Sequence, residues 1–191
     1  MSDTLHLMTD EEYYQANLRK MQDATAAMTE EDRALVLQAF EYANKAHAEQ
    51  RRKSGEPYII HPVSVSCIIA QIGLDVDSVI AGLLHDTIED TGATAEEIAR
   101  LFGEPVALLV DGVTRLTKMS DISVGSREEA QMEDLRKMFV AMAKDIRVII
   151  IKLADRLHNM RTSQYWKTEK QQQKALETME IYTPLAHRLG M

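Results

Sequence analysis

Four ionisable side chains stand within six positions at the end of an apolar segment. His85 and Asp86 follow the run 79–84, whose composition is typical of a buried helix. Glu89 and Asp90 come about one turn later. Burying such groups is costly unless they are paired or bind a metal. The pattern therefore indicates a site of chemistry, and the competing interpretation is a solvated helix end with a chance His-Asp pair.

Helical spacing would bring these side chains together. On an α-helix, residues three and four positions apart share a face. His85 and Glu89 are four apart, and so are Asp86 and Asp90. Since neighbouring residues differ by about 100° around the axis, His85 and Asp86 can both reach one point beside the helix. We therefore expect an imidazole and a carboxylate on one ion, with two further carboxylates a turn below.

A second polar stripe follows another apolar run near the C-terminus. Asp155, Asn159 and Thr162 are spaced at i, i+4 and i+7 along a segment that otherwise reads as a buried helix. This position favours a buried role for Asp155. The alternative is an ordinary ion pair of Asp155 with a neighbouring arginine, either Arg156 or Arg161.

His61 is the third element and directly precedes Pro62. A residue before proline is pushed toward extended geometry. His61 is therefore expected at a fixed corner between a loop and a helix that starts at Pro62. Taken alone, a histidine at such a corner is more often structural than a metal ligand.

Together these segments offer two imidazoles and two carboxylates as a candidate metal site, namely His61, His85, Asp86 and Asp155. Mixed nitrogen and oxygen donors suit manganese, iron or zinc, and geometry favours the first two if water fills open positions. Such an ion lowers the pKa of bound water and generates a nucleophile. Glu89 and Asp90 would then transfer a proton or orient that water.

Composition places the site in an ordinary globular protein. The 191 residues suffice for one domain with a sizeable core. The net charge of −8 argues against a broad basic face for long nucleic acid. A local cluster of cations, Arg51, Arg52 and Lys53, can still attract a small anion. Cys67 is the single cysteine and cannot form an internal disulfide.

Targeting signals are missing from the sequence. There is no apolar run of about 18 residues, so no transmembrane helix and no membrane partner are expected. The acidic N-terminus lacks the profile of a signal peptide. We therefore expect a cytoplasmic protein.

Helix start signals recur along the chain, whereas strand signals are nearly absent. The run 148–151 has strand propensity, but apolar spacing at three and four residues continues beyond it and favours helix. We expect an all-α bundle of about eight helices, divided into an N-terminal helical extension, 1–28, and a main domain, 29–191. Loops are expected at 51–60 and 118–126. The helices are expected near 30–50, 62–73, 75–91, 94–103, 105–119, 126–144, 146–162 and 169–189, the last with a possible kink at Pro184.

Five long segments of the sequence resemble the N-terminal hydrolase domain of the Rel/SpoT alarmone enzymes, within the HD phosphohydrolase superfamily. The resemblance covers about residues 30–191. It rests on the segments RKSGEPYIIHP, AGLLHDTIEDT, FGEPVALLVDGVTRLTKM, RKMFVAMAKDIRVIIIKLADRLHNMRT and IYTPLAHRLGM. It implies an Mn²⁺-dependent hydrolase that removes the 3′-diphosphate of guanosine tetra- and pentaphosphate as pyrophosphate.

The resemblance also implies a role for each site residue. The metal ligands are the four residues of the candidate metal site, His61, His85, Asp86 and Asp155. The catalytic pair is Glu89 and Asp90. The guanine and ribose contacts fall on a loop triplet and on the second polar stripe, here Arg52, Lys53, Ser54, Asn159 and Thr162. An arginine such as Arg52 can lie flat against a purine, although an exposed loop cation is the simpler interpretation of it alone.

Other interpretations stay open. Bifunctional members continue from a segment like LAHRLGM into synthetase and regulatory domains, whereas this sequence ends at Met191 and carries no synthetase motif. It is either part of such an enzyme or a stand-alone hydrolase, and we expect no synthesis. The alternatives are a related phosphohydrolase acting on another nucleotide, such as the 2′-phosphate of NADPH, a non-catalytic nucleotide-sensing module, and a structural helical bundle.

Overall fold

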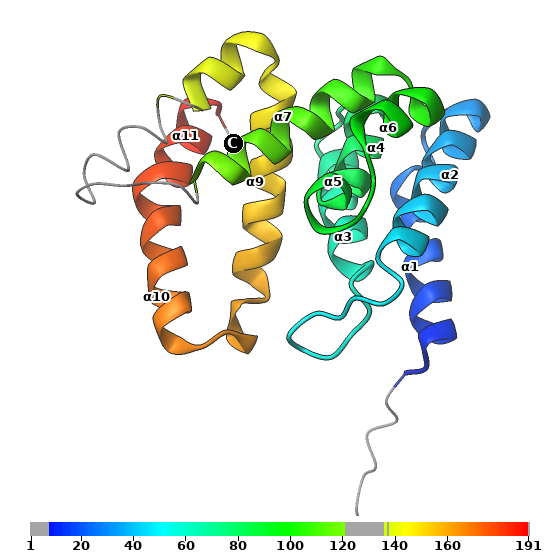
Figure 1. Ribbon diagram of the computed structural model, residues 1–191, viewed down its shortest axis with the longest axis horizontal. Coiled ribbons are helices and arrows are strands. Elements are labelled where there is room, and N and C mark those ends of the chain that lie inside the picture. Colours follow the sequence, from blue (N-terminus) through cyan, green and yellow to red (C-terminus); the bar gives the residue numbers. More distant parts are fainter. Residues whose placement is uncertain (1–7, 121–135, 137, 191) are drawn as a thin grey trace, which may run out of the picture.

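The computed structural model describes residues 8–120, 136 and 138–190, without the side chains of 118–120. Its described part is built of helices, with one isolated β-bridge between Arg51 and Pro57. This confirms the all-α prediction. In chain order the elements are α1 (Asp10–Ala24), α2 (Glu30–Ala46), α3 (Ile60–Gln71), α4 (Val76–Leu84), α5 (Thr87–Asp90), α6 (Ala95–Phe102), α7 (Glu104–Ser120), α9 (Ile146–Arg161), η1 (Ser163–Tyr165), α10 (Thr168–Glu177), η2 (Thr178–Tyr182) and α11 (Thr183–Arg188) (Figure 1).

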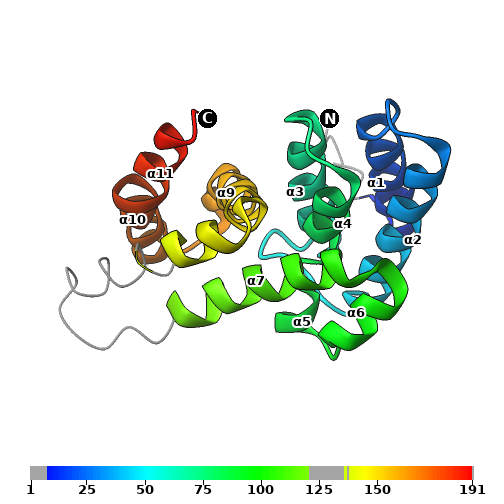
Figure 2. The ribbon, with the colours of Figure 1, turned by 90° about the horizontal axis from the view of Figure 1, so that it is seen from above.

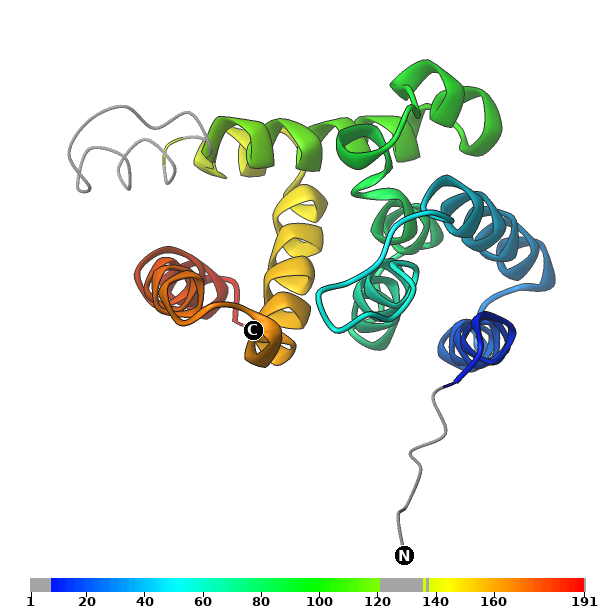
Figure 3. The ribbon, with the colours of Figure 1, turned by 60° about the horizontal axis from the view of Figure 1, so that its bottom comes forward.

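The helices form two groups that α7 connects. Helices α1 to α6 lie on one side, and α9 to α11 lie on the other (Figure 2). Helix α7 runs along one face of both groups and packs against α4, α6 and α9 (Figure 3). Helix α9 also packs against α3 and α4. The buried hydrophobic core runs from α1 and α2 through α3, α4 and α7 to α9 and α11. The site residues come from α3, α9 and the turn after α4, where the two groups meet.

Polar side chains cap the predicted helix starts. Thr29, Asp75, Thr94 and Asp145 each accept a hydrogen bond from a backbone N–H in the first turn of α2, α4, α6 and α9. Such bonds satisfy donors that have no partner within the helix. The predicted helical assignment of 148–151 is also confirmed, because these residues belong to α9.

Helix α3 begins before the proline that was expected to start it. His61 is the second residue of α3, so the prediction that it occupies an extended corner is wrong. The first four N–H groups of a helix have no intrahelical partner, and Pro62 in the first turn therefore costs no hydrogen bond. This placement fixes His61 on a helix and orients its ring toward the core.

The helix predicted over 75–91 is two helices. Helix α4 ends at Leu84, His85 and Asp86 form a turn, and α5 follows. Side-chain donors occupy the carbonyls that a continuous helix would use: His85 Nδ1 lies 2.9 Å from Gly82 O, and Thr87 Oγ1 donates to Leu84 O at 2.7 Å. This turn directs His85 and Asp86 toward His61 of α3.

The C-terminal helix is also divided. The predicted kink near Pro184 takes the form of a π-helical turn, η2, which ends just before α11. Of the predicted loops, 51–59 is irregular and is followed by α3. Residues 118–120 instead belong to α7, so that loop prediction is wrong at its start, and 121–126 lie outside the described residues. Within the predicted helix over 126–144, the described residues 136 and 138–144 are helical.

The N-terminal helix joins the core. Helix α1 packs against α2 and α3, and Met21 is fully buried. The boundary proposed at residue 28 stays a prediction. In the described part of the chain, no helix is both long and apolar enough to cross a membrane.

Close contact between α3 and α4 brings the two histidine-bearing segments together. Ser66 Oγ donates to Val79 O at 2.7 Å across this contact. A Cβ added at Gly82 would lie 2.6 Å from Ile69 Cδ1 and 3.2 Å from Ser66 Cα. The glycine is therefore needed for the approach of the two backbones.

We expect Gly82→Val to lower the free energy of unfolding by about 1–3 kcal/mol, because the added side chain overpacks the contact between α3 and α4. Urea denaturation measures the change. Gly92→Val is the matched control, since an added Cβ there meets nothing within 4 Å, and its effect should stay within about 0.5 kcal/mol. Equal effects at both positions would contradict the close-packing interpretation.

Candidate metal centre

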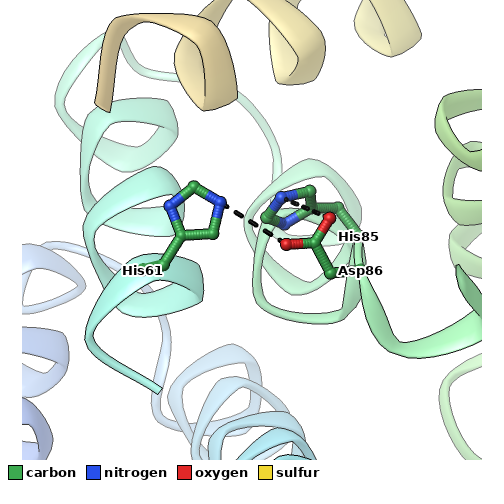
Figure 4. A group of neighbouring side chains, drawn as sticks. All are labelled: His61, His85 and Asp86. Atoms are coloured by element: carbon green, nitrogen blue, oxygen red, sulfur yellow. Dashed lines mark ion pairs between the residues drawn. The ribbon is translucent and has the colours of Figure 1, made fainter. Parts of the chain in front are cut away.

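Three side chains from two segments converge on one point. His61 comes from α3, and His85 and Asp86 come from the turn after α4; their candidate ligand atoms all lie within 4.8 Å of one another (Figure 4). The Asp86 carboxylate faces both rings, with Oδ2 3.4 Å from His61 Nε2 and Oδ1 3.1 Å from His85 Nε2. Both histidines are buried. The predicted His-Asp pair and the predicted third ligand therefore do meet.

Asp155 approaches the same two rings from α9. Its Oδ1 lies 3.2 Å from His61 Nε2 and 3.9 Å from His85 Nε2, and the residue is buried. The structure thus brings the four predicted ligands together, with Asp86 and Asp155 both facing the pair of imidazoles. Two carboxylates around two rings, one buried and one partly buried, form a negative centre that calls for a cation.

The hydrogen bonds of His85 support a metal at this point. Because its Nδ1 lies 2.9 Å from the backbone carbonyl of Gly82, Nδ1 carries the proton. Its Nε2 is buried and faces the carboxylates of Asp86 and Asp155, at 3.1 and 3.9 Å. A buried ring nitrogen facing carboxylates, with its other nitrogen fixed by a carbonyl, is the arrangement of a metal-ligating histidine. The residues therefore fit a divalent metal held by imidazole nitrogen and carboxylate oxygen.

Without a metal ion, a proton can bind His85 Nε2 in its place. Burial alone would lower the pKa of His85, but the carboxylates of Asp86 and Asp155 outweigh it and raise that pKa to about 9. Burial likewise works to raise the pKa of Asp86, yet the histidines beside it hold that pKa well below its usual range. Without a metal, the centre is therefore an ion-paired cluster with a protonated His85.

Lys152 is a site residue that the sequence reasoning missed. Its Nζ donates to Asp155 Oδ2 at 2.8 Å and to Thr117 Oγ1 of α7 at 2.9 Å. Asp155 therefore pairs with a lysine three residues earlier, whereas Arg156, one of the two arginines of the alternative interpretation, pairs with Glu177. The i, i+3 spacing was a visible signal, but the lysine lay inside an apolar run.

Tyr58 is a second missed residue and links two aspartates. Its hydroxyl lies 2.8 Å from Asp86 Oδ2 and 3.1 Å from Asp90 Oδ2, and its ring stacks on His47 with centroids 4.6 Å apart. Since a phenol has one proton, it donates to one of the two carboxylates at a time. Gln50 Nε2 donates to the backbone carbonyl of Asp90 at 2.7 Å and helps to hold that residue in place.

Helix α5 carries the predicted proton-transfer pair. Asp90 is exposed and reaches the cluster through Tyr58, whereas Glu89 is partly buried and lies three positions after Asp86. The structure therefore places both carboxylates on the helix that follows the His-Asp turn. Their chemical roles stay a prediction.

A cavity of about 200 Å³ adjoins the cluster. The five predicted substrate-binding residues all line it: Arg52, Lys53, Ser54, Asn159 and Thr162. Arg52 Nη2 donates to Thr162 Oγ1 at 3.1 Å, which ties the loop to α9. Asn159 donates from Nδ2 to Asp155 Oδ1, so the cavity and the cluster share one face of α9.

Two aromatic side chains also line this cavity, and the sequence reasoning missed them. Tyr165 and Trp166 line it, and Lys170 lies over the Trp166 ring with Nζ 5.3 Å from the centroid. Their position at the cavity is visible only in the folded structure, because they follow α9 in a segment without a recognised sequence pattern. A larger hollow of about 520 Å³ beside α7 contains none of these residues.

Comparison with known proteins adds independent evidence. The family model described as the HD domain matches residues 39–191. The GTP pyrophosphokinase of Streptomyces coelicolor is 58% identical over 156 residues, which are 82% of this chain and 18% of that protein. The bifunctional (p)ppGpp synthase/hydrolase SpoT of Escherichia coli is 53% identical over 156 residues, with 82% and 22% covered.

A solved structure is similar over most of its length. It is described as a metazoan ortholog of SpoT that hydrolyzes ppGpp. It is 33% identical, with a TM-score of 0.61 over 78% of this chain and 83% of that chain. The curated relatives are longer, and this chain spans about a fifth of their length.

Metal binding should release a proton at neutral pH. His85 is protonated in the metal-free centre below its pKa of about 9, and it must be neutral to ligate. We therefore expect about one proton to be released per Mn²⁺ at pH 7.5, and the affinity to rise with pH until about 9. Calorimetric titration in two buffers of different ionisation enthalpy measures the release. Binding without release at pH 7.5 would show that His85 is already neutral.

Proposed function

This chain belongs to the HD domain family shared with the Rel/SpoT enzymes, and from that premise we propose that it is a metal-dependent 3′-pyrophosphohydrolase. Its substrates are guanosine tetra- and pentaphosphate, and its products are pyrophosphate with GDP or GTP. One observation carries the proposal: the four-residue metal centre adjoins a cation-lined cavity through Asn159. One of the relatives is named as a GTP pyrophosphokinase, and the other as a bifunctional synthase and hydrolase of (p)ppGpp. The His-Asp centre supports hydrolysis for this chain, and synthesis would belong to the part of those proteins outside the match.

Manganese is the ion we propose for the centre. His61 and His85 offer nitrogen, and Asp86 and Asp155 offer oxygen, which is a donor set that manganese accepts with positions left open. When bound, a divalent ion lowers the pKa of a water ligand and neutralises charge on the phosphoryl group. The family resemblance supports the choice of manganese over iron or zinc.

The nucleotide is proposed to lie in the 200 Å³ cavity. Arg52 is held by Thr162 at 3.1 Å and by Asn159 at 3.5 Å, so its planar guanidinium is positioned to lie against a purine. Arg51, Lys53 and Lys170 add positive charge around the same cavity. Such a cluster gives an acidic protein a local site for a polyphosphate.

The carboxylates of α5 are proposed to move the protons. Water attacks the phosphorus nearest the ribose, and the bond from that phosphorus to the 3′-oxygen breaks. One carboxylate, Glu89 or Asp90, accepts a proton from the attacking water, and the 3′-oxygen takes up a proton as it leaves. Tyr58 holds Asp90 beside Asp86, which keeps this one of the two candidate proton acceptors next to the metal centre.

Hydrolysis of guanosine tetraphosphate by the purified chain tests the proposal. After chelation we expect no turnover, and Mn²⁺ should restore the release of GDP and pyrophosphate in equal amounts. NADPH is assayed in parallel, because the cations and aromatic rings of the cavity also suit another purine nucleotide. Phosphate release from NADPH alone would identify a related phosphohydrolase, and metal binding without turnover of either would favour a nucleotide-sensing module.

Glu89→Gln should lower kcat by about 10²- to 10⁴-fold, because the amide cannot carry the proton. Mn²⁺ affinity should be retained, since Glu89 is outside the ligand set. Glu96→Gln, an exposed change on α6, is the matched control and should leave kcat unchanged. Hydrolysis by Glu89→Gln at the wild-type rate would refute the role assigned to this residue.

Arg52→Lys should raise KM by about 10- to 100-fold, because charge-assisted hydrogen bonds of about 1.5–3 kcal/mol and the planar stacking group are lost. The kcat should change less, since the metal centre is intact. Steady-state kinetics with guanosine tetraphosphate give both constants. Arg33→Lys on the exposed side of α2 is the control. An unchanged KM for Arg52→Lys would exclude the nucleotide contact.

A further inference from the structure

We propose that His158 is a positioning residue that fixes the tautomer of His61 by accepting the proton of its Nδ1. The inference rests on the proposed metal site, and it does not depend on which nucleotide is hydrolysed. His158 lies on α9, one turn after Asp155, and neither the polar stripe nor the predicted ligand set includes it.

The two imidazoles are in direct contact. His61 Nδ1 lies 2.7 Å from His158 Nδ1, and the ring centroids are 4.9 Å apart. Both residues are buried, with relative exposures of 1% and 8%. At this separation the two nitrogens share one proton, because two N–H groups would repel and two bare lone pairs would leave a buried contact without a bond.

The surroundings of His61 Nε2 determine whether the shared proton is bonded to Nδ1 of His61 or to Nδ1 of His158. Its Nε2 faces Asp155 Oδ1 at 3.2 Å and Asp86 Oδ2 at 3.4 Å. A metal at this point requires the Nε2 lone pair, so a ligating His61 must carry its proton on Nδ1. The Nδ1–H then donates to His158, whose Nδ1 is the acceptor and whose own proton is on Nε2.

A neutral acceptor suits this centre. The groups that accept the free N–H of a metal-ligating histidine are usually carboxylates, carbonyls or water. The cluster already contains Asp86 and Asp155, and one more buried carboxylate would add like charge. The imidazole of His158 orients the ring of His61 without adding charge.

His158 also connects the metal centre with the nucleotide cavity. The residue lines the cavity, and its backbone carbonyl accepts a hydrogen bond from Thr162 Oγ1 at 3.1 Å. The same hydroxyl accepts from Arg52. Substitution of the His158 side chain removes the contact with His61 but keeps the backbone carbonyl that binds Thr162. We therefore expect such a substitution to affect metal binding more than nucleotide binding.

Ring ¹⁵N NMR of the wild-type chain loaded with Zn²⁺, a diamagnetic ion that imidazole and carboxylate also bind, tests the tautomers directly. We expect His158 to be protonated at Nε2 and bare at Nδ1, with His61 protonated at Nδ1. The His158→Asn variant removes one set of ring signals and so assigns them. A proton on His158 Nδ1 would overturn the proposal, since His158 would then be the donor. The tautomers are read in the wild-type protein, and the variant serves only to assign the signals.

A matched pair of variants tests the consequence for the metal. His158→Asn keeps an oxygen near the position of Nδ1, whereas His158→Leu has the same branching without an acceptor. We expect His158→Leu to lose about 10- to 100-fold in Mn²⁺ affinity, measured by electron paramagnetic resonance titration, and His158→Asn to retain most of it. Equal losses in both variants at equal thermal stability would show that His158 acts by shape alone and would overturn the proposal.

Titration of the wild-type chain with Mn²⁺ distinguishes failure of the proposed metal-dependent function from failure of the role proposed for His158. If the wild-type chain binds no Mn²⁺, the proposed metal-dependent function fails. If it binds Mn²⁺ and hydrolyses its substrate while the tautomers are reversed, only the role of His158 fails.

Discussion

Two carboxylates, the buried Asp155 and the partly buried Asp86, face two buried imidazoles and impose the main constraint on this molecule. Asp86 and Asp155 lie within 3.4 Å of His61 Nε2, on segments about 70 residues apart in the chain. Such a cluster is unfavourable unless a proton or a metal ion neutralises it. Lys152 supplies part of the compensation by pairing with Asp155. The packing of α3, α4 and α9 is therefore inseparable from the electrostatics of the centre.

The same constraint explains local features of the backbone. Gly82 lets α4 approach α3 closely, and its carbonyl holds the ring of His85. The break between α4 and α5 turns His85 and Asp86 toward His61. A longer regular helix would keep its hydrogen-bond ladder but would not use side-chain donors at the helix end. The interruption is thus part of the site.

Substrate binding and metal binding share one helix in the proposed function. Helix α9 contributes Asp155 to the centre and Asn159 and Thr162 to the cavity, and Asn159 touches both. The loop 51–59 closes the cavity from the other side through Arg52 and holds two aspartates through Tyr58. A change in this loop should therefore affect both nucleotide affinity and the geometry of the carboxylates.

The sequence by itself determined the helical class, most helix starts and the four residues that meet at the centre. The helices follow from local rules, because caps and apolar spacing act on residues close together in the chain. The candidate ligands were found segment by segment from the cost of burying charge, and the family resemblance implied that they act together. Tertiary structure decided what local rules cannot see. It placed His61 inside α3, broke the helix at His85, and brought Tyr58, Lys152 and His158 into contact with the candidate ligands. These contacts depend on how α3, α9 and the loop 51–59 pack, and no spacing along one segment can encode a distance between two segments.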